Sequence, residues 1–259
     1  MDIIIVSAVA LVASGLTLFS GFGLGTLLLP AMLIVLPPQA AVAATAIVHF
    51  ANNLLKVALF GRHCRMDVLI RFGGVAVVAA FFGAQLLMRL AQLPPIGSYT
   101  LAGNEIEIVQ VTFVISVLIF GFAIFDLSPA KKRTEFGPHL LPVGGFISGF
   151  LGGLSGHQGA MRSAFLASSG LTKEAFIGTG VTVACMVDVT RIIVYGLHLS
   201  SFTNENLPLM VAACISAFFG VFLGQKLLKK VTMEQIRELV GVGLILLSIA
   251  LGSGLLSSS

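Results

Sequence analysis

The chain has 259 residues, of which 57% are hydrophobic and only 10% are charged, and its mean hydropathy is +1.04. A soluble domain keeps roughly a quarter of its residues charged, so there is too little polar sequence here to cover a buried core. The composition excludes an ordinary soluble domain and predicts a polytopic membrane protein in a lipid bilayer. The net charge of +4 does not indicate nucleic-acid binding, because the cations lie in short loops between apolar runs.

Eight apolar segments follow one another along the chain, most of them close to the roughly 20 residues that span a hydrocarbon core. They cover residues 3–36, 40–60, 72–90, 106–125, 140–168, 175–195, 207–224 and 239–256. The first and fifth are too long for one straight helix, and glycine-rich stretches at 20–25 and 152–159 interrupt them. Non-helical backbone at membrane depth persists only where protein or a watery cavity satisfies it. We therefore expect a broken helix in each.

The two halves of the chain resemble each other. Ser14-Gly15 recurs as Ser148-Gly149, Gly25 as Gly159 and Thr45 as Thr179, all with one spacing of 134 residues. One residue later in register, a polar residue, a cation, an aromatic residue and a glycine recur as Asn53, Lys56, Phe60, Gly61 and Asp188, Arg191, Tyr195, Gly196. This pattern predicts a first repeat at 1–128, a cytoplasmic linker at 129–139 and a second repeat at 140–259.

Loop charges predict the orientation of the segments. Basic residues cluster at 62–71, 131–133 and 226–237, which we assign to the cytoplasm, whereas 94–104 and 200–206 carry no Lys or Arg. Only an odd number of crossings fits between residues 136 and 195, so the fifth segment is predicted to be a re-entrant hairpin. Each half then has a hairpin plus three transmembrane helices, the second half is inverted, and both termini lie outside. Inverted repeats with broken helices are common in secondary transporters.

These features resemble the TauE/SafE family of sulfite and sulfonate exporters. The resemblance rests on the glycine-rich break, the Pro37-Pro38 or Leu171-Thr172 turn, and a helix with threonine early and a cation late, all occurring twice. The second break departs from the plain glycines of many members, because it contains His157 and Gln158. The resemblance implies an all-α permease of the bacterial inner membrane that exports sulfite or an organosulfonate.

The substrate is expected between the two breaks. Backbone N–H groups at a glycine-rich break beside a helix N-terminus form an anion site without any side chain. The guanidinium of Arg162 fits a sulfonate, although it could instead reach the cytoplasmic surface. His157 titrates near neutral pH, as sulfite does, which would allow proton coupling, but a lone histidine often only satisfies a carbonyl. The predicted substrate-binding residues are Gly21, Phe22, Gly23, Gly25, Gly156, His157, Gln158, Gly159 and Arg162.

Other polar residues within the apolar segments are candidates for a transport pathway. They are Thr45, His49, Asn52, Asn53, Lys56, Thr179, Asp188 and Arg191. Each has a structural alternative: an Asp188–Arg191 pair would neutralise itself, Lys56 could extend to the surface, and the threonines could bond neighbouring helices. The glycines also have one, because Gly21-xxx-Gly25 and Gly149-xxx-Gly153 are small-xxx-small packing patterns.

The sequence is also compatible with other functions. An anion channel and a non-transporting scaffold are not excluded by the sequence. Gly153-Leu154-Ser155-Gly156 matches the motif around a rhomboid-protease serine, but we expected no histidine base within reach and therefore no enzyme activity. The chain has no ATP-binding loop and no His/Cys pairing at ligand spacing, so no cofactor or metal is expected. A homodimer is left open.

Overall fold

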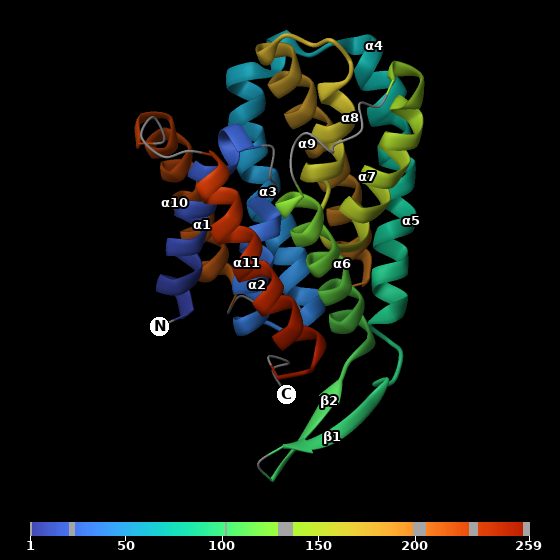
Figure 1. The fold of residues 1–259 in the computed structure, drawn as a ribbon, viewed down its shortest axis with the longest axis vertical. Coiled ribbons are helices and arrows are strands. Elements are labelled where there is room, and N and C mark those ends of the chain that lie inside the picture. The colour runs from blue at the N-terminus through green and yellow to red at the C-terminus, as the bar shows by residue number, and fades with distance from the viewer. Residues whose placement is uncertain are drawn as a thin grey trace.

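The computed structural model describes residues 2–20, 24–101, 103–128, 137–198, 206–227 and 233–255. These residues form a bundle of helices with one two-stranded hairpin at one end (Figure 1). The α-helices are α1 (Asp2–Ser20), α2 (Leu24–Val35), α3 (Pro38–Phe60), α4 (Met66–Val68), α5 (Val75–Leu90), α6 (Gln110–Leu127), α7 (Leu141–Ser155), α8 (Gly159–Ala167), α9 (Lys173–His198), α10 (Leu207–Leu227) and α11 (Met233–Gly252).

Shorter elements complete the described chain. The 3-10 turns η1 (Gly61–His63) and η4 (Pro138–Leu140) follow α3 and precede α7. A π-helical turn, η2 (Leu69–Gly74), joins α4 to α5. The strands β1 (Gly97–Leu101) and β2 (Asn104–Ile108) pair antiparallel, with Gly97 opposite Ile108 and Leu101 opposite Asn104.

Four helical stretches in the described chain are long and apolar enough to cross a membrane: Pro38–His63, Met66–Leu90, Lys173–Leu197 and Leu207–Gly224. Shorter apolar helices cover Asp2–Leu16, Leu24–Val35, Gln110–Phe125 and Gly241–Gly252. This confirms the predicted class, a helical bundle with membrane-spanning segments. The predicted boundaries were wrong in three places: the third segment begins near Met66 rather than residue 72, residues 106–108 belong to β2 rather than to a helix, and the eighth segment begins at Met233 rather than residue 239.

Both long segments are broken helices whose two arms return to the end at which they began. The start of α1 and the end of α2 lie at the end of the bundle that carries β1 and β2 (Figure 1). The start of α7 and the end of α8 lie at the opposite end, beside α4 (Figure 1). The N-terminal end of α1 and the C-terminal end of α11 share the β-hairpin end (Figure 1).

Two glycine-lined seams hold these hairpins against the long helices. Helix α7 packs on α5 through Gly145, Gly149 and Gly153, where an added Cβ would lie 2.3, 2.1 and 2.0 Å from backbone carbonyl oxygens of η2 and α5. Helix α1 packs on α10, where a Cβ on Gly15 would lie 3.0 Å from the carbonyl oxygen of Gly220. The packing interpretation therefore holds for Gly149 and Gly153.

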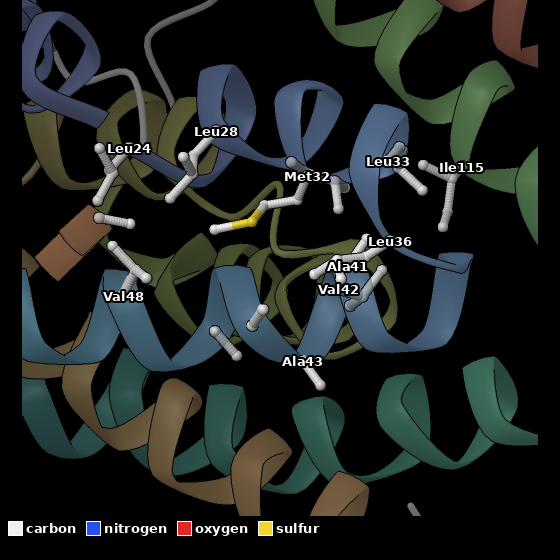
Figure 2. Packing of buried hydrophobic residues seen from close by; sticks show 14 of the residues in the cluster. Leu24, Leu28, Met32, Leu33, Leu36, Ala41, Val42, Ala43, Val48 and Ile115 are labelled. Atoms are coloured by element: carbon white, nitrogen blue, oxygen red, sulfur yellow. The ribbon is translucent and has the colours of Figure 1, made fainter. Parts of the chain in front are cut away.

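The apolar core lies between the hairpins and the long helices. Side chains of α2, including Leu24, Leu28 and Met32, pack onto Val42 and neighbouring residues of α3 (Figure 2). Ile115 of α6 reaches the same cluster beside Leu33 (Figure 2). Helix α3 can begin at this point because Pro38 occupies its first turn, where the missing N–H leaves no intrahelical bond unmade. The turn at 36–37 therefore reverses the chain and lays α2 along α3.

Candidate functional site

A cluster of bonded polar side chains lies where α3, α9 and the α7–α8 break meet. We call it the central polar cluster and define it as His49, Asn53, Gln158, Asp188 and Arg191, all buried. Asp188 is its centre: one carboxylate oxygen lies 2.6 Å from His49 Nδ1 and accepts from Asn53 Nδ2 at 3.3 Å. The other accepts from Arg191 Nε at 3.0 Å and from Gln158 Nε2 at 3.5 Å.

This cluster ties the two halves of the chain together. His49 and Asn53 come from α3, whereas Asp188 and Arg191 come from α9. Because an ionised carboxylate only accepts hydrogen bonds, His49 must donate through Nδ1. The ion pair predicted between Asp188 and Arg191 is present, with Nη2 2.8 Å from Oδ1. Truncating one partner would leave the other as an unpaired buried charge.

The two helix breaks meet beside the cluster. Helix α7 ends because Gly156 takes the left-handed conformation, with φ +81°, and its N–H donates to the Gly152 carbonyl at 2.9 Å. A Cβ on Gly25, in the first turn of α2, would lie 3.4 Å from the Gly156 carbonyl oxygen and 3.7 Å from Thr45. The starts of α2 and α8 therefore lie close together in the protein interior.

Gly156 also lets Arg191 approach the break. A Cβ at this position would lie 2.7 Å from Arg191 Nη1, so any larger residue would displace the guanidinium. Helix α8 begins at Gly159, and Gln158 provides no side-chain cap. Its first N–H groups therefore point into the interior without a capping side chain, in the arrangement that favours an anion.

His157 and Gln158 are both buried in the break, but they differ in their hydrogen-bond partners. His157 stacks on Phe122, with ring centroids 5.5 Å apart, and its Nδ1 lies 3.1 Å from the Ser155 carbonyl oxygen. A carbonyl only accepts, so Nδ1 carries the proton and Nε2 of the neutral ring has a lone pair. The predicted role of His157 as an anion donor thus requires its protonated form. Gln158 instead uses its amide nitrogen on Asp188.

Lys56 and Arg162 are buried cations outside the ion pair. Lys56 is 6% exposed, so it does not extend to the surface. Arg162 is half-buried, its Nη1 is fully buried, and its side chain lies against Gly180, where a Cβ would be 3.6 Å from Nε. Among the described residues, Arg162 Nη1 has no hydrogen-bond partner.

The other predicted residues fall into two groups. Thr45 and Asn52 border the site: Thr45 is next to Gly25, and Asn52 accepts from Ser14 Oγ at 2.9 Å. Thr179 lies apart from it, because its hydroxyl accepts the backbone N–H of Arg65 at 3.0 Å and so fixes the segment after α3. Gly159 is buried at the start of α8. Gly21, Phe22 and Gly23 lie outside the described residues.

Several buried donors in this region have no partner among the described residues. They are the amide nitrogen of Asn52, Nη1 of Arg162 and Nη1 of Arg191, together with the Thr45 hydroxyl. The charge is also unbalanced: Lys56, Arg162 and Arg191 stand against the one carboxylate of Asp188, a formal net charge of +2 with the histidines neutral. Buried donors and cations that lack partners are costly unless a ligand satisfies them.

Sequence reasoning missed three residues that hold the site. Ser148 donates to the Gln158 carbonyl at 3.1 Å, Ser14 bonds Asn52, and the Tyr195 hydroxyl donates to the Gly153 carbonyl. The repeat analysis had already paired Ser14 with Ser148, and an identical polar residue at matched positions in apolar helices was the signal that marked them.

The serine-protease motif has no activated serine here. Ser155 Oγ donates to the Leu151 carbonyl at 3.2 Å and lies 3.1 Å from Nδ1 of His157, a histidine that the sequence argument overlooked. That nitrogen carries the proton, so it does not act as a base toward Ser155. In the described part of the chain, no group of three His, Cys, Asp or Glu side chains is arranged to hold a metal.

Of the three comparisons with known proteins, one finds a match. No curated protein and no solved structure matches the chain. The family model described as sulfite exporter TauE/SafE matches residues 6–251, which is almost the whole chain and includes both breaks and the central polar cluster. The protein therefore belongs to the sulfite exporter TauE/SafE family.

Proposed function

We propose that this protein is a secondary transporter that carries sulfite or a small organosulfonate across the bacterial inner membrane by alternating access. Its family consists of multi-pass membrane transporters of sulfite-like anions. The substrate and the mechanism are the proposal. Proton coupling and a homodimer stay predictions from the sequence.

The observation that carries the proposal is the meeting of two helix breaks beside buried cations. Gly25 and Gly156 are in contact, and α8 starts there without a capping side chain. An oxyanion stripped of water needs several charge-assisted donors, and helix N-termini supply them at depth without a side chain. In this proposal the backbone N–H groups of Gly25 and of His157, Gln158 and Gly159 bind the anion. Arg162 and Gln158 supply the side-chain contacts.

We infer that residues 1–128 and 140–259 are inverted repeats that move against each other around this site. Equivalent elements make equivalent contacts: α1 packs on α10 as α7 packs on α5. Asn53 and Asp188, matched in the sequence, bond each other at 3.3 Å, as expected of positions near a two-fold axis. The two hairpins open toward opposite ends (Figure 1). Such repeats support alternating access by rocking around a fixed site.

The same proposal places both termini and the β-hairpin in the periplasm. In a variant without native cysteines, a cysteine at the exposed Thr100 should react with a membrane-impermeant thiol reagent in intact spheroplasts. A cysteine at the exposed Arg62, at the α4 end, should react only after permeabilisation. The reverse result would overturn the orientation.

The binding site is tested by removing Arg162. Arg162→Ala should weaken sulfite binding to the purified protein roughly 10- to 100-fold, the usual effect of losing charge-assisted hydrogen bonds. Isothermal titration calorimetry in detergent measures this. Arg71→Ala, which removes an exposed cation at the same end of the bundle, should leave binding unchanged. Normal binding and transport by Arg162→Ala would show that the anion binds elsewhere.

A further inference from the structure

Two cations, the buried Lys56 and the half-buried Arg162, lie on the α4 side of the central polar cluster. Lys56 follows Asn53 by three residues on α3, toward the α4 end. Arg162 lies in the first turn of α8 and contacts Gly180, two turns before Asp188 on α9 and therefore on the same side. Gly178 of α9 lies against the Phe60 carbonyl, one turn after Lys56, and Gly180 lies against Arg162, so both cations lie beside the same part of α9.

Within the described residues, no ion pair joins either cation to a carboxylate. Asp188 attracts Arg162, but its oxygens already accept from His49, Asn53, Gln158 and Arg191. Arg162 Nη1 is buried and has no hydrogen-bond partner within the described ranges, and α3 contains no acidic residue that could pair with Lys56. Two like charges held at membrane depth without an anion are very costly.

We propose that Lys56 and Arg162 form one anion subsite that selects a compact oxyanion with two negative charges over a singly charged one. This inference rests on the proposed function and adds Lys56 as the specificity-determining residue. Arg162 presents a planar pair of donors to two oxygens, while Lys56 adds a compact second charge. The net charge of +2 in the surrounding region matches a dianion such as sulfite, whereas a sulfonate leaves one charge unbalanced.

Sulfite and methanesulfonate are suitable probes, because both present three oxygens on sulfur. Slightly above neutral pH, sulfite is mostly a dianion and methanesulfonate is a monoanion. By calorimetry, the unmodified protein should prefer sulfite by roughly tenfold or more, as expected for one additional charge-assisted contact. Equal affinities for the two probes would overturn the inference without any variant.

Neutral substitutions at Lys56 then test the residue. Lys56→Gln and Lys56→Met should weaken sulfite binding by roughly tenfold and change methanesulfonate binding by less than about threefold. Lys56→Arg should restore the preference, which a purely structural role would not require. The exposed control Arg71→Gln should change neither affinity.

The two proposals fail in different ways. If Arg162→Ala abolishes binding but neutral Lys56 variants keep the sulfite preference, the dianion subsite is wrong and the transport proposal stands. If Arg162→Ala binds sulfite normally, the proposed site itself is wrong. If a Lys56 variant loses both anions equally while remaining monodisperse, Lys56 does not determine specificity.

Discussion

Helices α3 and α9 carry polar residues at matched positions, but these residues are paired differently in the two helices. On α9, Asp188 and Arg191 form a buried ion pair, and two residues of α3 add bonds to the carboxylate. On α3, Asn53 carries no charge, so Lys56 has no intrahelical counter-ion. Because α3 has the amide of Asn53 where α9 has the carboxylate of Asp188, Arg191 is paired within its own helix and Lys56 is not. In the proposed site, Arg191 therefore holds the fold and Lys56 is available to a ligand.

The seams that hold the two hairpins, α7 on α5 and α1 on α10, are both lined by glycine. Along α7 and α5, three glycines at four-residue intervals bring the helices to backbone contact. Along α1 and α10, Gly15 meets Gly220 and Gly224 with glycines on both helices. Gly83 of α5 also belongs to the first seam, because a Cβ there would lie 2.1 Å from the Phe150 carbonyl oxygen, so in both seams the close approach involves glycines of both helices.

The largest effect should come from Asp188. Asp188→Ala leaves Arg191 buried without its partner, and such losses cost about 3–5 kcal/mol of stability. The matched change Asn53→Ala removes only hydrogen bonds, which are worth about 1 kcal/mol each. The loss of stability in the two variants is compared by heating each protein in detergent and measuring the folded fraction that remains by size-exclusion chromatography. Equal losses would mean that the α9 ion pair does not hold the fold.

A smaller effect should follow from closing the α7–α5 seam. A methyl group on Gly149 would lie 2.1 Å from the Ala76 carbonyl oxygen, so Gly149→Ala must move one helix, at a cost of about 1–3 kcal/mol. Gly15→Ala should cost less, because its closest backbone atom is 3.0 Å away. The same unfolding assay measures both.

The control for the seam is Gly121 in α6. An added methyl group there meets nothing within 4 Å, so Gly121→Ala should be neutral or slightly stabilising through helix propensity. If Gly149→Ala behaves like Gly121→Ala, the close approach of α7 to α5 contributes nothing to stability.

Composition and spacing predicted the architecture because these signals are local. Glycine runs marked both breaks, and the repeat matched Asn53 with Asp188. The contact between His49 and Asp188 was not predictable, because the two residues are 139 positions apart and only tertiary packing joins them. The β-hairpin was missed although Ile106 and Ile108 alternate with Glu105 and Glu107, the period of a strand. The apolar run into α6 concealed that alternation.

That hairpin has a mechanical consequence. The Tyr99 hydroxyl of β1 donates to the Ser253 carbonyl at 2.8 Å, just beyond α11, and the Glu107 carbonyl lies close to Gly254. The loop between α5 and α6 is thus fastened to the last helix of the other half, at one end of the bundle only (Figure 1). If the halves rock, this strap resists their separation there. Opening of the bundle at that end, which alternating access requires, must therefore bend or release the strap.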